Sequence, residues 1–545
     1  MSIPLLLSVA AAMLRILVFL IVCALPAVSV AIEASGRVFI DRNGNGVLDS
    51  GEPGLAGAKV SNGRDIALTD AHGSYRIVIA ENDTVFVIKP PGTAFPKGEH
   101  GLPRFWRHHR TANNPALRYG GMTVSDARRI DFPLDAAAGI EGEPLEVLVF
   151  GDPQPKSLID VDFYARDIVE PIIGKHPARF GLSLGDIAHD DLSLYPALNR
   201  VTSRLGVPWL HAAGNHDIDF DAASDADALL SFRQTFGPDT FAWEEAHASF
   251  IVLDNVVYLP GQSPAYIGGL REDQFRFLEN YLAGLDQQRR VVIAGHISFF
   301  DPLPGVETFR SADRARLFGL LEGFSNVLLL TAHGHVQRQY FHDLEDGWRG
   351  AAPLHEYNVG ATCGSWWSGA VDADGLPDAS MADGTPNGYA VLRIAPDGDY
   401  ALRWYVARQP DDFGIALHAP KVLRHGAWPG VPVVANVFMG AEGDRVEVRI
   451  AGGAWRAMQR IDQPDPRQLA QNLIDDAADP LRGYDRLPQA ANSTHLWRYP
   501  LPTDLAPGEH LIEVRAISSG PAGQGRRWPG ELRADSRYRL DAVDR

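Results

Sequence analysis

The chain has very little cysteine and a shortage of positive charge, and both features exclude classes of protein. Only two of its 545 residues are cysteines, Cys23 and Cys363. Cys23 lies in an apolar leader, so a chain that loses the leader keeps one thiol and can form no internal disulfide. Fifty lysines and arginines face 68 aspartates and glutamates, which gives a formal net charge of −18. This charge repels nucleic acid, so we expect no nucleic-acid partner, and a phosphate substrate would need local cations.

Long apolar runs are also scarce, and the one at the N-terminus has the form of a secretory signal. Residues 16–23 are all apolar, one arginine precedes them, and small residues at positions 29 and 31 fit the cleavage rule. We therefore predict a signal peptide over residues 1–31 and a secreted or periplasmic protein. An uncleaved anchor is the alternative, but an arginine and a proline interrupt the run, so no stable membrane insertion is expected.

The length of the chain exceeds what one hydrophobic core can organise, and the residue patterns change twice along it. Short strand and turn patterns fill residues 32–140 and return over 420–545, so we predict a β-sandwich domain at each end. Residues 144–406 alternate apolar strands with helical stretches, which indicates an α/β domain. The basic stretch PRFWRHHR, residues 103–110, is predicted to be a solvated loop, with reach over an active site as the alternative.

A loop with calcium-type spacing lies in the N-terminal domain. Its twelve residues carry oxygen-bearing side chains at positions 1, 3, 5, 9 and 12 and glycine at position 6. The candidate calcium ligands are Asp41, Asn43, Asn45, the backbone carbonyl of Val47, Asp49 and Glu52. Because its flanks are strand-like, the loop resembles the calcium-carrying β modules of bacterial surface proteins. A polar hairpin turn without an ion is the alternative, and the sequence leaves both open.

Residues of metal-binding type follow five apolar strand patterns in the middle domain. In chain order the motifs are GDPQ, GDIAHD, GNHD, GH and HGH, between residues 151 and 335. Ligands bind at the carboxyl ends of strands in α/β folds, so we expect the five motifs to meet at one edge of the sheet. Each motif alone is weak evidence, because an Asp or His at a strand end is usually part of a turn or of the core.

Taken together, the motifs over residues 146–340 resemble the calcineurin-like metallophosphoesterase superfamily. The two ends resemble the flanking modules of a bacterial subgroup of that family, and residues 360–369 look like its usual strand and loop. The resemblance implies a four-layer αββα sandwich, an α/β catalytic domain flanked by β-sandwich domains. It also implies two divalent metal ions (Mn, Fe, Zn or Mg) bridged by Asp186. The implied ligands are Asp152, Gln154 and His335 at one position, and Asn215, His296 and His333 at the other.

The implied reaction is hydrolysis of a phosphate mono- or diester by a metal-activated hydroxide. His216, next to a ligand, would protonate the leaving alkoxide or stabilise the transition state. Asp217 could orient His216 through the other ring nitrogen, and Asp190 is expected beside the ligands and not among them. Trp366 and Trp367 are candidates to line the substrate cleft, with packing against the C-terminal domain as the alternative. The partner is then a small or polymeric phosphate ester.

One residue departs from the family's motif. The first motif ordinarily reads Asp-x-His, and Gln154 stands at the position of that histidine. An amide oxygen is a harder and weaker donor than imidazole, so the identity and occupancy of the metal are in question, while the reaction class is not. The competing function is a surface adhesion or scaffold protein with a degenerate metal domain and a calcium-binding β module. A nuclease of the same fold is disfavoured by the acidic charge.

Overall fold

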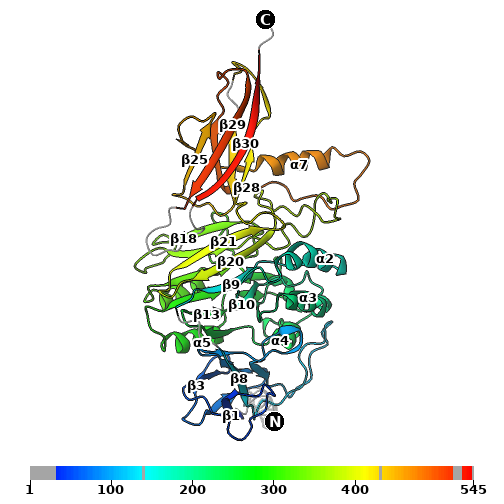
Figure 1. The fold of residues 1–545 in the computed structure, drawn as a ribbon. Helices are drawn as coiled ribbons and strands as arrows, with labels where there is room; N and C mark the ends of the chain where they lie inside the picture. The colour runs from blue at the N-terminus through cyan, green and yellow to red at the C-terminus, as the bar shows by residue number, and fades with distance from the viewer. Residues whose placement is uncertain (1–31, 138–141, 429–431, 519–530, 543–545) are drawn as a thin grey trace, which may run out of the picture.

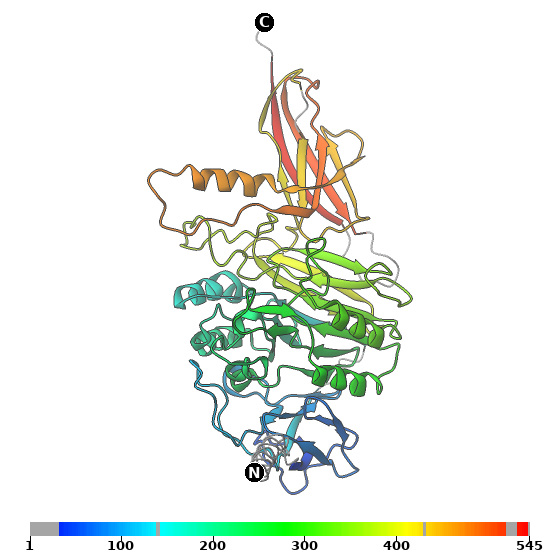
Figure 2. The ribbon, with the colours of Figure 1, turned by 180° about the vertical axis from the view of Figure 1, so that it is seen from behind.

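The computed structural model describes residues 32–137, 142–428, 432–518 and 531–542, so the predicted signal peptide lies outside the described residues. Three regions follow one another along the long axis of the molecule (Figure 1). A β-rich N-terminal region lies at one end, a mixed α/β core in the middle and a β-rich C-terminal region at the other end, and the reverse view shows the same order (Figure 2). Within the described ranges, no helix has the length and apolar character needed to cross a membrane.

The N-terminal region is a β-sandwich of two four-stranded sheets, with orders β4-β1-β8-β6 and β3-β2-β5-β7. Strand β4 shows why the sheets pack: Tyr75, Ile77 and Ile79 are buried, while the residues between them face solvent. The strands are β1 (Ile32–Asp41), β2 (Lys59–Ser61), β3 (Ile66–Leu68), β4 (Ser74–Ile79), β5 (Thr84–Ile88), β6 (Thr93–Ala94), β7 (Trp106–His108) and β8 (Phe132–Ala136).

The core contains a five-stranded sheet with order β11-β10-β9-β20-β21 and a six-stranded sheet with order β12-β13-β16-β17-β19-β18. The strands of the first are β9 (Leu145–Phe150), β10 (Phe180–Leu184), β11 (Trp209–Ala212), β20 (Gly388–Ile394) and β21 (Tyr400–Val406). Those of the second are β12 (Phe241–Glu244), β13 (Ala248–Val252), β16 (Arg290–Ala294), β17 (Val327–Thr331), β18 (Arg338–His342) and β19 (Leu354–Asn358). A short hairpin is formed by β14 (Val256–Tyr258) and β15 (Tyr266–Gly268).

The two core sheets pack face to face. The ring of Phe180 in β10 lies edge-on to Trp243 and Phe250 of the other sheet, with centroids 5.2 and 5.1 Å apart. Helices cover the outer faces, which is why the central strands β10 and β16 are buried along their whole length. The helices are α2 (Leu158–Phe163), α3 (Tyr195–Thr202), α4 (Leu230–Phe236), α5 (Glu272–Leu282) and α6 (Ser311–Leu321), with α2 and α3 on one side of the core and α5 on the other in Figure 1. The expected α/β core between two β-rich regions is confirmed.

The C-terminal region is a second β-sandwich, with sheet orders β22-β24-β28-β27 and β23-β30-β29-β25-β26. Its elements are β22 (Ile415–His418), β23 (Val422–Arg424), β24 (Pro432–Val437), β25 (Arg445–Ile450), β26 (Arg456–Ala457), β27 (Gln459–Pro464), α7 (Pro466–Asp476), β28 (Asn492–Pro500), β29 (Gly508–Ile517) and β30 (Glu531–Asp541). It is fixed to the core through Asp383, whose carboxylate lies 3.0 Å from His495 Nε2 and whose carbonyl accepts from Asn436 at 3.1 Å. These contacts hold the long loop after β19, which borders the candidate site.

Candidate metal centre

Five strand ends meet at one edge of the core. Candidate ligands follow β9, β10, β11, β16 and β17, and these are parallel strands of the two sheets. Ligand-type atoms of Asp186, His296 and His333 all lie within 4.8 Å of one another. Residues far apart in the sequence are therefore brought together where the strand-end motifs predict them.

The backbone at this edge is strained in a way that the rest of the molecule mostly avoids. Thirteen described non-glycine residues have positive φ, and eight of them belong to the candidate site. They are Asp152, Gln154, Asp186, Asp190, His333, His335, Trp366 and Trp367. Positive φ values are unfavourable for residues with a Cβ atom. They are kept where the surrounding structure holds side chains in position for a functional centre.

Two motif glycines are required by close approach. A Cβ atom on Gly185 would lie 2.5 Å from His296 Nδ1, and one on Gly214 would lie 2.2 Å from Asp186 Oδ1. Both distances are shorter than any real Cβ contact. The glycines of the GD and GNH motifs therefore allow the strand ends to approach closely enough to share a site.

His296 is the centre of one group of ligand-type atoms. Its Nδ1 lies 2.8 Å from the Leu184 carbonyl, which can only accept, so this nitrogen carries the hydrogen. Its Nε2 lies 3.0 Å from Asn215 Oδ1, 3.1 Å from His333 Nδ1 and 3.3 Å from Asp186 Oδ2. Four electron-rich atoms this close need a shared proton or a cation between them. Carboxylate, amide and imidazole donors together suit a first-row divalent ion.

The second group of ligand-type atoms surrounds Asp152. Its Oδ1 is buried and has no hydrogen-bond partner, and His335 Nε2 lies 3.8 Å away. His335 Nδ1 lies 2.7 Å from the Gly364 carbonyl, which leaves Nε2 with the lone pair. A buried carboxylate oxygen without a partner costs free energy unless a cation faces it, so this group also fits a metal ion.

Gln154 does not present its oxygen to this second group. Its Nε2 donates to Asp186 Oδ2 at 3.1 Å, while its Oε1 faces Cys363 Sγ at 3.8 Å. An amide nitrogen cannot bind a metal, so the expected ligand role of Gln154 does not hold in this orientation. The reason is that Asp186 and Cys363 together select the amide rotamer, and Cys363 lies on a distant loop.

Burial and neighbouring charge shift the pKa values of these groups. Burial raises the pKa of Asp152 to about 7. Burial would also raise the pKa of Asp186, but His296 outweighs it and holds this pKa below its usual range. Burial would lower the pKa of His296, yet Asp186 and Asp152 raise it to about 9. Burial lowers the pKa of His333 to about 3 and that of His335 to about 4, so both rings are neutral, the form that binds metal.

His216 lies beside the ligands and is held by Asp190. Its Nδ1 is 2.7 Å from Asp190 Oδ1, and its backbone N–H donates to Asp186 Oδ1 at 2.8 Å. Burial would lower the pKa of His216, but the Asp190 hydrogen bond and the charge of Asp186 raise it above its usual value. The ring of His189 stacks on His216 with centroids 4.3 Å apart, a contact that no sequence pattern signals.

Asp217 does not orient His216, contrary to the sequence-based expectation. Its carboxylate is fully buried and accepts hydrogen bonds from the Gly214 and Ile187 amides and the Tyr195 hydroxyl, at 2.8 to 3.2 Å. The side chain therefore turns into the core and holds the GD and GNH segments together. The physical reason is the turn at Asn215–Asp217, which directs neighbouring side chains to different sides.

Family models match both ends of the chain. The N-terminal model of the calcineurin-like phosphoesterases matches residues 42–119, and the C-terminal model matches residues 356–520. The chain belongs to the calcineurin-like phosphoesterase family. The candidate ligands, from Asp152 to His335, lie between the two matched segments.

Among solved structures, two phosphatases are similar to this calcineurin-like phosphoesterase. The purple acid phosphatase from yellow lupin (Lupinus luteus) seeds is 12% identical, with a TM-score of 0.37 over 69% of this chain and 67% of that one. A dimetal phosphatase from Danio rerio is 15% identical, with a TM-score of 0.31 over 46% of this chain and 92% of that one. No curated protein matches the chain.

The two tryptophans of the loop after β19 have different environments in this calcineurin-like phosphoesterase. Trp366 is 37% exposed and stacks on His335, with ring centroids 4.7 Å apart. Trp367 is buried, and its Nε1–H donates to the Pro153 carbonyl at 2.9 Å. Trp366 thus borders the candidate centre, and its role in a substrate cleft stays a prediction, whereas Trp367 cannot line a cleft because it packs inside the core beside Phe163.

The N-terminal loop with calcium spacing is closed by its own hydrogen bonds. Asp41 Oδ2 accepts from the Gly46 amide at 2.6 Å, and the two Glu52 oxygens accept from the Arg42 and Asp49 amides, both at 2.9 Å. Ion-free polar turns make the same kind of bonds. Both alternatives for this loop, calcium site or empty turn, therefore remain.

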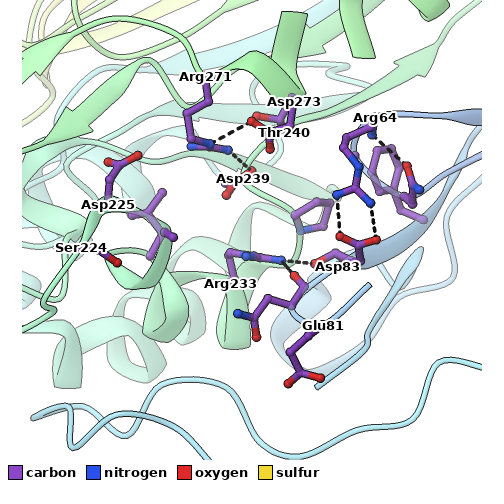
Figure 3. A pocket seen from close by; sticks show the side chains of 18 residues that line it. Arg64, Glu81, Asp83, Ser224, Asp225, Arg233, Asp239, Thr240, Arg271 and Asp273 are labelled. Carbon is purple, nitrogen blue, oxygen red and sulfur yellow. Dashed lines mark hydrogen bonds and ion pairs between the residues drawn. The ribbon is translucent and has the colours of Figure 1, made fainter. Parts of the chain in front are cut away.

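A cavity of about 550 Å³ lies where the N-terminal region meets the core, away from the candidate centre (Figure 3). Three arginines and several carboxylates line it, and two of the arginines are paired with carboxylates. Arg64 makes two hydrogen bonds to Asp83, at 2.7 and 2.6 Å, and Arg271 pairs with Asp239 and Asp273 at 3.3 and 3.2 Å. This cavity is lined by residues of both regions, and none of the candidate ligands lines it.

Proposed function

We propose that this calcineurin-like phosphoesterase is an exported enzyme that holds two divalent metal ions and hydrolyses phosphate mono- or diesters. The observation that supports this most is the arrangement of lone pairs at the strand ends. His296 and His335 each give their Nδ1 hydrogen to a backbone carbonyl, so both Nε2 atoms face the buried carboxylates of Asp186 and Asp152. A divalent cation between the ring nitrogens and the carboxylates would stabilise this arrangement.

Two sets of residues would hold the ions. Asp186, Asn215, His296 and His333 fit one position, and Asp152, His335 and a shared Asp186 oxygen fit the other. When bound, divalent ions supply Lewis acidity toward phosphate oxygens and lower the pKa of water. Gln154 could join the second set only if its amide turned to present oxygen, so this set offers fewer donors than the first.

His216 is the residue that would act on the leaving group. Asp190 fixes the ring through Nδ1, which directs Nε2 away from the carboxylate. Because its pKa is raised, the ring stays protonated over more of the neutral range and can give a proton to the leaving oxygen or a hydrogen bond to its charge. His189, stacked on the other face, restricts the ring's rotation.

Export and calcium binding belong to the same proposal. Export is supported by the apolar leader over residues 1–31, and calcium binding by the ligand spacing of the loop from Asp41 to Glu52. The competing adhesion or scaffold function would leave the whole ligand set without a use. No feature of the described residues favours it over hydrolysis.

The test is an activity and metal analysis of the mature protein. Chromogenic mono- and diesters are offered with Mn²⁺, Fe²⁺, Zn²⁺ and Mg²⁺ separately, and bound metal is measured by mass spectrometry. Asp186→Asn should lose turnover and metal at both positions, because an amide cannot neutralise two cations. The matched control is Asp162→Asn, an exposed carboxylate on α2, which should behave as wild type. Full activity in Asp186→Asn would contradict the two-metal proposal.

A further inference from the structure

A segment of the N-terminal region contacts two of the segments that carry the candidate ligands. We name residues 111–125, which follow β7, the strap. The Arg118 backbone N–H donates to Asp221 Oδ2 at 2.7 Å, and the Tyr119 hydroxyl donates to the Asp190 carbonyl at 2.8 Å. Asp190 and Asp221 belong to the segments that carry the GD and GNH motifs. The strap is therefore attached to both segments.

Further contacts fix the strap beyond these two residues. The Gly121 amide donates to Ser231 Oγ at 3.1 Å, and the Thr123 amide donates to Gln234 Oε1 at 2.8 Å, both on α4. A backbone anchored on two motif segments and a helix has a defined position. The side chains of Arg118 and Tyr119 are thus presented at a constant place on the catalytic domain.

Arg118 is an exposed cation without an acidic partner. Its guanidinium lies 5.1 Å from the centroid of the Tyr119 ring, which supports it from one side. Across the described ranges, no carboxylate lies within ion-pair distance of this guanidinium. Its donors are therefore available to a ligand.

The segments that the strap contacts carry several acidic residues, and a series of contacts connects the strap with His216. Asp190, Asp191 and Asp221 lie on the segments that the strap touches, and the whole chain has a charge of −18. From the Tyr119 hydroxyl, contacts run through Asp190 to the His216 ring at 2.7 Å. Arg118 thus belongs to a segment that contacts Asp190, the residue that holds His216, and it offers positive charge among acidic groups.

We propose that Arg118 binds a second anionic group, phosphate or carboxylate, carried by the leaving-group part of the substrate. The proposal rests on the proposed function and narrows its substrate class to esters with an additional negative charge. A guanidinium held on an aromatic ring presents paired N–H donors that match the oxygens of either anion. The basic stretch 103–110 is not the solvated loop that its sequence predicts: it contains β7, and His108, His109 and Arg110 are buried.

The experiment measures binding without turnover. Benzylphosphonate, 4-carboxybenzylphosphonate and p-xylylenediphosphonate have a C–P bond that a phosphoesterase does not cleave. Their affinities for the metal-loaded mature protein are compared by calorimetry. Wild type should bind at least one of the ligands with a second anion about tenfold more tightly than benzylphosphonate, as expected for a charge-assisted contact. The larger gain identifies the preferred anion, carboxylate or phosphonate.

Arg118→Gln should remove this preference and change benzylphosphonate affinity less than about twofold, because the variant keeps the metal ligands. Tyr119→Phe should reduce the preference in part, since the ring loses its bond to the Asp190 carbonyl. The matched control is Arg104→Gln, an exposed arginine of the same region that lies outside residues 111–125, which should behave as wild type.

Three results would overturn the assignment of Arg118. Wild type could show no preference or bind none of the phosphonates, or Arg118→Gln could weaken all three ligands equally. The last result would mean that Arg118 only balances the charge of Asp191 and Asp221. Ester hydrolysis is measured separately, so the two proposals can fail independently. Preference for the second anion without hydrolysis would contradict the proposed function and leave the anion site standing.

Discussion

Replacing Asp190 by Asn should slow turnover while leaving metal content and folding intact. The carboxylate holds His216 Nδ1 at 2.7 Å, and no candidate ligand depends on it. A hydrogen bond to a charged group contributes about 1.5–3 kcal/mol, and the 51% exposure of the Asp190 side chain places it at the lower end through screening. A loss of about 1–2 kcal/mol corresponds to a roughly 5- to 30-fold fall in kcat/KM.

Asp217→Asn is the informative counterpart, because the sequence alone favoured Asp217 as the partner of His216. Its buried carboxylate accepts bonds from Gly214, Ile187 and Tyr195, and an amide turns one acceptor into a donor facing another donor. We expect destabilisation by about 1–3 kcal/mol, with kcat of the remaining folded protein little changed. Chemical denaturation measures the first quantity, and turnover per bound metal measures the second.

The assay compares esters with good and poor leaving groups. If Asp190 keeps His216 in position to protonate the leaving oxygen, Asp190→Asn should lose more activity on a phenyl ester than on a nitrophenyl ester, which needs less protonation. Metal content is measured on the same samples. The reasoning is refuted if Asp217→Asn shows the leaving-group dependence with unchanged unfolding, while Asp190→Asn shows neither effect.

Three further outcomes are expected. His216→Ala should reduce kcat by roughly 10² to 10⁴ with metal content unchanged, and a fall in bound metal would make His216 a ligand. Calcium at about 100 times its Kd should stabilise the metal-loaded protein by roughly 2.7 kcal/mol, measured by thermal melting, and Glu52→Gln should remove most of this gain; equal melting with and without calcium would reduce the loop to a turn. Burial lowers the pKa of His211 from 6.5 to about 3. The stability that this neutral, buried ring contributes to the folded protein is therefore present above pH 6.5 and is lost as the pH falls. Denaturation at pH 7 and pH 5 should differ by about 2 kcal/mol from this group, and His211→Phe, beside Phe236, should remove that difference.

The sequence by itself determined the α/β core, the β-sandwich at each end and the edge where the motifs meet. These features follow from local rules. Apolar runs form buried strands, and polar residues directly after parallel strands share one edge. The motif glycines are visible in the sequence as well, and the structure shows that Gly185 and Gly214 are needed for the strand ends to approach one another.

Only the tertiary structure decided which neighbouring residue does what. Asp190 and not Asp217 holds His216, Trp366 and not Trp367 borders the centre, and Gln154 gives its nitrogen to Asp186. Adjacent side chains point in different directions. Because several residues at this edge have unusual positive φ values, those directions cannot be predicted from the residue pattern.

The contacts of the strap could not be predicted from the sequence either, because they join residues that are far apart along the chain. Tyr119 meets Asp190 across 71 residues, and Arg118 meets Asp221 across 103. No periodicity or motif spacing encodes such a contact, because it depends on how the N-terminal region packs against the core. Local chemistry along the chain therefore determined what the centre is made of, whereas packing between distant segments decided which charges face it.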